Sequence, residues 1–113
     1  MAASIINGKA LAEQIRDEIV AEVGKLATCG VKPGVATILV GGDGGAQFYR
    51  GQIEKNTATV GFNYSNHVLA ADTSEAEVLE LIATLNADAH VHGILALQPM
   101  QGQIDQNTVF NAI

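Results

Sequence analysis

The sequence predicts an α/β domain in three layers, with a mostly parallel sheet between two layers of helices. Apolar segments of strand length alternate with segments of helical periodicity, which is the pattern of right-handed βαβ units. One of these segments, residues 35–40 (VATILV), is apolar or β-branched throughout, as expected for a strand buried on both faces. With 113 residues, 48% of them apolar, the chain is long enough for one hydrophobic core. Residues 1–113 are therefore predicted to form a single domain.

The first element is predicted to be an amphipathic helix over residues 11–26. Its apolar residues recur at spacings of four, four, four and three, which places them in one stripe along a helix. They are Leu11, Ile15, Ile19, Val23 and Leu26. Gly30 and Pro33 are expected to end this segment before the first strand at Val35 to Val40.

The glycine-rich stretch after the first strand has two interpretations. Residues 41–45 (GGDGG) are predicted to form a flexible turn, followed by a helix over residues 47–59 that Gly61 ends. A phosphate-binding loop is the alternative, because the N–H groups at a helix start favour anions. The stretch matches neither GxxxxGK[ST] nor GxGxxG, and Asp43 would repel a phosphate, so the turn is favoured.

The rest of the chain continues the alternation. Residues 63–70 are predicted to be a second strand, and a third helix follows, with a capping box formed by Ser74 and Glu77. The buried face of that helix is expected to consist of Val78, Leu81, Ile82 and Leu85. Residues 91–99 (VHGILALQP) form the predicted third strand, and Asp105 or Asn107 is expected to cap a final helix.

Composition limits the possible functions. The net charge is −6 with only six Lys and Arg, which argues against a nucleic-acid partner. No apolar run reaches the length of a membrane span, and residues 1–10 lack the layout of a secretory signal. Cys29 is the only cysteine, so no internal disulfide is expected, in keeping with a reducing cytoplasm. The sequence therefore predicts a cytoplasmic protein with no nucleic-acid or membrane partner.

Ligands of parallel sheets bind beyond the carboxyl ends of the strands, where two candidate stretches lie, residues 41–50 and 97–103. Tyr49 is expected there either as a platform that stacks on a flat ligand or as a packing residue. Lys55 and Arg50 follow on the same helix, and Lys55 is either a base with a lowered pKa or a solvated lysine. Gln98 offers an amide for hydrogen bonds at the end of the third strand, or is simply a polar strand end.

The three histidines do not suggest a metal centre. His90 and His92 would share a face of the third strand if it began at His90, and both would then approach one ion. No third ligand with a suitable spacing accompanies them, so no metal is predicted.

The chain as a whole resembles a known protein family. The segments IINGKALAEQIRDEI, PGVATILVGGD, QFY, VGF, TSEAEVLELIATLNAD and GILALQP occur in the order found in the N-terminal catalytic domain of bifunctional methylenetetrahydrofolate dehydrogenase/cyclohydrolases. The resemblance runs from about residue 5 to residue 113. It implies the family's α/β fold and a tetrahydrofolate ligand in its 5,10-methylene or 5,10-methenyl form.

The resemblance also implies roles for individual residues. In the family a Tyr stacks on the folate, and a Lys four residues later drives catalysis. Tyr49 matches the former, but Ile53 stands at the lysine position, and Lys55 matches only a second, less critical lysine. A Gln near the end of the third strand supports the family's lysine, and here that position is Leu97, with Gln98 one place later. We predict substrate contacts from Tyr49, Arg50, Ile53, Leu97, Gln98 and Pro99, with Lys55 and Gln98 as the candidate catalytic residues.

Further departures from the family pattern are Gly44 for a loop Pro, Ala46 for a Ser and Gln101 for a second Pro. The family's KDVDG segment and nicotinamide-binding half have no counterpart within residues 1–113, so no NAD(P) is expected. Three hypotheses follow. The first is altered one-carbon transfer on a folate, and the second is a non-catalytic folate-binding or interaction module. The third is a split enzyme that pairs with a separate nicotinamide-binding chain. A homodimer or a partner chain is expected to cover an exposed apolar face.

Overall fold

The computed structural model describes residues 2–113 as four helices and three strands. In chain order the elements are α1 (Gly8–Thr28), β1 (Gly34–Val40), α2 (Gly44–Val60), β2 (Asn63–Leu69), α3 (Glu75–Ala87), β3 (Gly93–Ala96) and α4 (Gln106–Ala112). None of these helices is both long enough and apolar enough to cross a membrane. The predicted alternation of strands and helices is confirmed.

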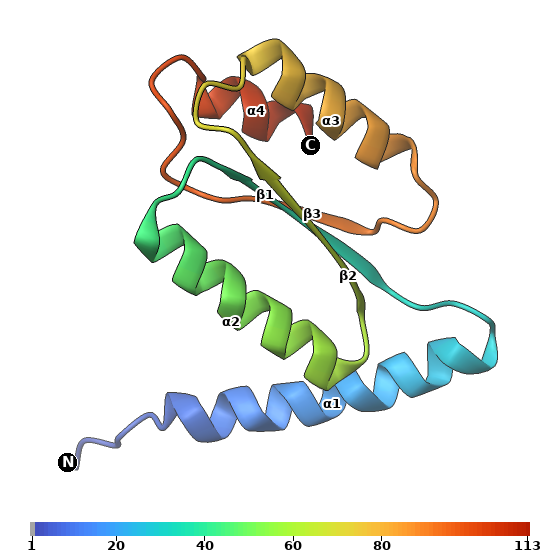
Figure 1. Cartoon of the computed structure of the whole chain (residues 1–113). Coiled ribbons are helices and arrows are strands. Elements are labelled where there is room, and N and C mark those ends of the chain that lie inside the picture. The colour runs from blue at the N-terminus through green and yellow to red at the C-terminus, as the bar shows by residue number, and fades with distance from the viewer. Residues whose placement is uncertain (1) are drawn as a thin grey trace.

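The sheet has the strand order β2-β1-β3, and both pairings are parallel. Helices α1 and α2 lie on one side of it and α3 and α4 on the other, which gives the predicted three layers (Figure 1). Strand β1 is central, and its residues from Ala36 to Val40 are all buried. Because all strands run in the same direction, the ends of β1 and β3 and the start of α2 meet at one edge of the sheet.

The main core lies between the sheet and the pair α3–α4. Alternate residues of β1 point into it, namely Ala36, Ile38 and Val40, and they contact Val78, Ile82 and Leu85 of α3. Ile104 and Val109 complete the buried set from the C-terminal segment. The predicted capping box of α3 is present, with reciprocal bonds between Ser74 and Glu77 at 3.2 Å. Leu81 is half-buried beside this core.

Helix α2 begins earlier than the sequence predicts. Gly44 and Gly45, expected in a flexible turn, form its first residues. The reason is Asp43, whose carboxylate accepts from the Ala46 N–H at 2.9 Å and whose carbonyl accepts from the Gln47 N–H. This N-cap compensates for the poor helix propensity of glycine. The predicted end at Gly61 is confirmed, since that residue adopts φ +87°.

Strand β3 is shorter than predicted. Its ladder with β1 covers Gly93 to Ala96, and the Leu97 N–H adds one bond to the Ile38 carbonyl at 2.9 Å. The strand begins at Gly93 and not at the predicted Val91, and the His90 N–H donates to the Asp88 carboxylate at 2.8 Å in the preceding turn. His92 precedes the strand, and its Nδ1 accepts from the Gly34 N–H at 2.9 Å. Asp105, one of the two proposed caps, does cap α4.

Helix α1 keeps its apolar stripe largely in solvent. None of its residues is buried, and Leu11, Ile15 and Leu26 are each at least 40% exposed. Two adjoining apolar hollows of about 350 and 340 Å³ run along it toward the C-terminal end of α2. Both are lined by Ile15, Ile19 and Phe62. Helix α1 therefore presents an apolar face that the other described residues leave partly exposed.

Gly34 is expected to tolerate no side chain. A Cβ at this position would overlap the backbone carbonyl oxygen of His90, whereas a Cβ at Gly93 would meet nothing within 4 Å. Gly34→Ala should therefore lower the free energy of unfolding by about 1–3 kcal/mol, because backbone rather than a flexible side chain must shift. Gly93→Ala, at the neighbouring strand start, should change it by less than about 1 kcal/mol. Urea denaturation of both variants measures the difference, and equal stabilities would contradict the expectation.

Candidate functional site

The candidate site lies where β1 and β3 end and α2 begins. After Val40 the chain turns at Gly41, which adopts φ +87°, and Asp43 then starts α2. Leu97 follows the last residue of β3 at the same edge. The two stretches that the sequence analysis placed at this edge, residues 41–50 and 97–103, are thus brought together.

The floor of this site is apolar. Leu39, Ala46 and Leu97 are buried together, and the half-buried side chain of Ile53 packs against them. We call these four residues the apolar floor. They come from β1, from α2 and from the segment after β3, so the floor joins α2 to the end of the sheet. None of the four can take up or release a proton.

Leu97, and not Gln98, points into the apolar floor. Leu97 continues the alternation of β3 through its bond to Ile38, and its side chain is 4% exposed. Gln98, the next residue along, is exposed, as is Pro99. Because a shift of one residue along an extended segment turns a side chain to the opposite face, the Gln98 amide does not occupy the place of Leu97.

The aromatic and cationic candidates on α2 occupy different positions. Tyr49 is 56% exposed near the start of the helix, which leaves its ring accessible at the sheet edge. Lys55 is exposed, and it lies about 200° around the helix from Ile53, so it points away from the apolar floor. The structure therefore places Tyr49 and Ile53 at the site and Lys55 outside it.

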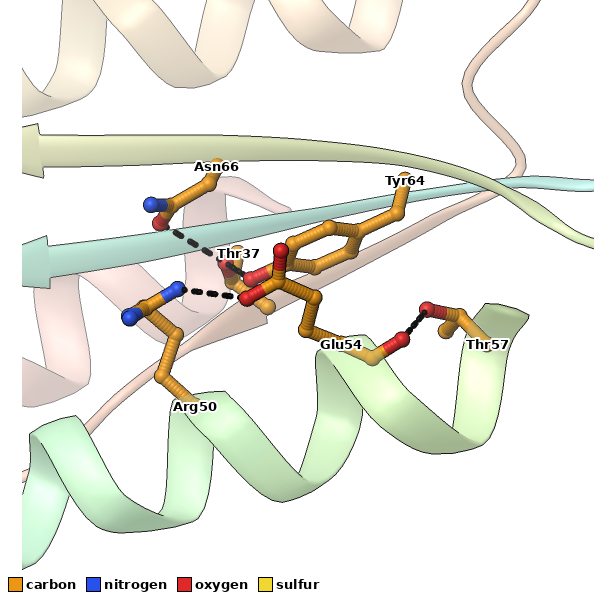
Figure 2. Close-up of polar contacts among 6 residues, drawn as sticks. All are labelled: Thr37, Arg50, Glu54, Thr57, Tyr64 and Asn66. Atoms are coloured by element: carbon orange, nitrogen blue, oxygen red, sulfur yellow. Dashed lines mark hydrogen bonds and ion pairs between the residues drawn. The ribbon is translucent and has the colours of Figure 1, made fainter. Parts of the chain in front are cut away.

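Arg50 belongs to a polar cluster on the side of α2 that faces β2 (Figure 2). The Arg50 guanidinium contacts the Glu54 carboxylate at 3.2 Å. Beside them the Thr37 hydroxyl is 2.7 Å from the Tyr64 hydroxyl and donates to Asn66 Oδ1 at 3.4 Å. We call Thr37, Arg50, Glu54, Tyr64 and Asn66 the polar cluster. Its bonds lie within α2 and within the sheet, and the Arg50 and Glu54 side chains extend from α2 toward Thr37 and Tyr64 (Figure 2).

The polar cluster keeps Arg50 cationic. The pKa of the Arg50 guanidinium is raised above its ordinary value, first by the neighbouring Tyr64 hydroxyl and then by the Glu54 carboxylate. Burial acts in the opposite direction and does not offset these effects. Arg50 is thus a positive charge paired with Glu54 at 3.2 Å.

The sequence analysis missed Thr37, Tyr64 and Asn66. Thr37 stands in the apolar run VATILV, where its β-branched side chain suggested only a strand residue. Its hydroxyl is fully buried, so it requires a partner. Tyr64 and Asn66 are two residues apart on β2 and thus share one face, and the register pairs Asn66 with Thr37. The two polar residues Tyr64 and Asn66 on one face of this strand were the sequence signal that could have indicated the cluster.

Removing the Tyr64 hydroxyl is expected to destabilise the fold. Tyr64→Phe leaves the buried Thr37 hydroxyl with only the longer contact to Asn66, which should lower the free energy of unfolding by about 1–2 kcal/mol. Adding Thr37→Val removes the hydroxyl that has lost its Tyr64 partner and should recover part of the lost free energy of unfolding. A double-mutant cycle in urea measures the coupling, and a coupling near zero would contradict the role given to the pair.

Within residues 2–113 no group of three or more His, Cys, Asp and Glu is arranged to hold a metal ion. His92 is engaged by Gly34, and His90 is exposed in the preceding turn. His67 pairs in register with Ile38 on β2, and its buried Nε2 has no hydrogen-bond partner in the described part of the chain.

Comparison with known proteins identifies relatives over nearly the whole chain. Residues 6–113 match the family model described as tetrahydrofolate dehydrogenase/cyclohydrolase, catalytic domain. Bifunctional protein FolD of Geotalea uraniireducens is 49% identical over 98% of the chain, and bifunctional protein FolD 1/3 of Ruegeria pomeroyi is 47% identical over 100%. The chain spans about 40% of the length of these curated relatives, namely 40% and 38%.

Solved structures agree with these relatives. The bifunctional enzyme FolD of Campylobacter jejuni matches 99% of the chain with a TM-score of 0.96 and 31% identity, over 40% of its own length. A Trypanosoma brucei dehydrogenase-cyclohydrolase, solved with NADP cofactor and an inhibitor, matches all of the chain with a TM-score of 0.90 and 28% identity, over 39% of its own length. The architecture described above is therefore the one these enzymes use.

Proposed function

The chain belongs to the tetrahydrofolate dehydrogenase/cyclohydrolase catalytic-domain family, and we propose that it binds a one-carbon tetrahydrofolate without lysine-driven acid–base chemistry. The ligand would lie at the edge of the sheet, with Tyr49 stacked on its aromatic part and its reactive end against the apolar floor. The candidate ligands are the 5,10-methylene or the 5,10-methenyl form. The proposal concerns the catalytic-domain portion, since the relatives are longer.

One observation carries the proposal. Ala46, Ile53 and Leu97 stand where the family pattern has Ser, Lys and Gln, and all three lie in the apolar floor. A general base must be within hydrogen-bond reach of the proton that it moves, and no side chain of the floor titrates. Replacing a buried polar set by apolar groups that pack together is compatible with a stable fold, whereas removing one member alone leaves the others unpaired. The three differences from the family pattern thus amount to one change, in which a polar set is replaced by an apolar cluster.

Binding at Tyr49 is tested by calorimetric titration with 5-formyl- and 5,10-methylene-tetrahydrofolate. Tyr49→Ala should weaken binding at least about tenfold, because it removes the stacking surface, while Tyr49→Phe should retain most of the affinity. Phe48→Ala removes the adjacent ring, which is 70% exposed, and serves as the matched control. If the Tyr49→Ala and Phe48→Ala variants bind equally well, the ligand does not lie at Tyr49.

Altered one-carbon transfer is the second candidate function. It is favoured by Arg50, a permanent cation one residue from Tyr49 that is held in place by Glu54. A fixed charge and a bound folate can accelerate transfer by positioning alone, without a titrating lysine. Turnover of 5,10-methenyl-tetrahydrofolate by the unmodified chain, lost in Arg50→Gln, would establish this function in place of the non-catalytic one.

A further inference from the structure

The apolar floor offers no charge to a ligand. Its four side chains are aliphatic, and the nearest cation of the polar cluster, Arg50, is already paired with Glu54 at 3.2 Å. The Glu54 carboxylate extends toward Thr37 and Tyr64 of the sheet (Figure 2). Lys55 is exposed and points away. A group resting on the floor therefore meets hydrocarbon, because the neighbouring carboxylates are already engaged, that of Asp43 by the Ala46 N–H at 2.9 Å and that of Glu54 by Arg50.

One-carbon tetrahydrofolates differ in charge at the reactive end. The 5,10-methenyl bridge is a cation delocalised over two nitrogens, whereas the 5,10-methylene bridge and the 5-formyl group are neutral. An ion moved from water onto an apolar surface without a partner loses solvation that nothing replaces, while a neutral group of the same size loses much less. The chain's net charge of −6 does not compensate, because distant surface charges are screened at physiological salt.

We propose that the apolar floor selects neutral one-carbon folates, the 5,10-methylene or 5-formyl forms, and rejects the cationic 5,10-methenyl form. This selection rests on the proposed function, because it requires the reactive end of a folate to lie against Ile53 and Leu97. It narrows the ligand to reduced folates that carry no charge on the one-carbon unit. The site then holds a neutral one-carbon unit and excludes the ion that a cyclohydrolase consumes.

Parallel titrations with 5-formyl- and 5,10-methenyl-tetrahydrofolate test the selection. The two ligands carry the one-carbon unit at the same oxidation level but differ in charge and in the bridge between N5 and N10, so 5,10-methylene-tetrahydrofolate, which has the bridge without the charge, is titrated as the matched control. We expect the methenyl form to bind at least about tenfold more weakly to the unmodified chain. Equal or tighter binding of the methenyl form would overturn the selection while leaving the proposed function intact. Absence of binding by either ligand would instead refute the proposed function itself.

A charge-introducing variant gives a second readout. Ile53→Glu places a carboxylate in the floor and should narrow or reverse the preference, since the cation then gains a partner. Ala21→Glu, at an exposed position of α1, adds the same charge elsewhere and should leave the preference unchanged. A preference that shifts equally in both variants would mean that long-range charge, not the floor, sets it. Circular dichroism checks that each variant is folded. If Ile53→Glu does not fold, the comparison of the two ligands on the unmodified chain still decides the proposal.

Discussion

Ala46→Ser, Ile53→Lys and Leu97→Gln, introduced together, are expected to raise hydrolysis of 5,10-methenyl-tetrahydrofolate about 10²–10⁴-fold over the unmodified chain. The three positions lie in one cluster, so the new lysine gains polar neighbours at the place where the apolar floor now stands. Ile53→Lys alone should raise the hydrolysis rate little, because its ammonium would lie against Leu39 and Leu97 with no partner. The unpaired ammonium would also destabilise the fold. The loss of the methenyl absorbance measures the rate.

The matched control for this gain replaces Ile53→Lys by Ile53→Met in the same triple variant. Methionine has similar length and no titratable group, so it reproduces the changed packing without the base. A rate in the lysine variant no higher than in the methionine variant would show that position 53 does not face the reactive end of the folate. The apolar floor would then be a packing feature outside the ligand site.

Ile38→Ala is expected to produce the largest loss of stability. Ile38 is 0% exposed at the centre of β1, and its side chain lies in the core beneath α3 and α4. Truncation removes the transfer free energy of three carbon atoms and leaves a cavity, which together cost about 2–5 kcal/mol. The free energy of unfolding of a small domain is about 5–15 kcal/mol in total, so the variant should unfold at a much lower urea concentration.

The control for the core is Ile5→Ala. Ile5 is 96% exposed ahead of α1, so the same truncation there should change the free energy of unfolding by less than about 0.5 kcal/mol. Urea denaturation followed by circular dichroism compares the two. Similar midpoints for both variants would contradict the assignment of the core to the α3–α4 face of the sheet.

Local signals predicted much of the fold. The capping box at Ser74, the αL glycine at Gly61 and the run from Val35 to Val40 each act within a few residues, and each is found as expected. The start of α2 was missed because glycine disfavours helices, and the Asp43 cap that reverses this preference was read as a loop residue. The length of β3 depends on how far it pairs with β1, which no local pattern in the sequence encodes.

The candidate site was less predictable. Tyr49 was singled out by its place after the first strand, and Ile53 and Leu97 by the resemblance to the family. That Ala46, Ile53 and Leu97 share one apolar floor depends on how α2 crosses the end of β3, which requires the three-dimensional arrangement. The polar cluster was missed because Thr37 is indistinguishable by residue type from its apolar neighbours in a buried strand. Only its fully buried hydroxyl, visible in the folded chain, reveals that it needs Tyr64.

Locating a bound folate on the chain decides whether the apolar floor faces the ligand. Backbone amide chemical shifts, recorded by NMR during titration with 5-formyl-tetrahydrofolate, report this at each residue. We expect changes concentrated at Tyr49, Ile53 and Leu97, at the edge of the sheet where α2 begins. Changes confined to the apolar hollows along α1, at Ile15, Ile19 and Phe62, would contradict it, as would the absence of any change.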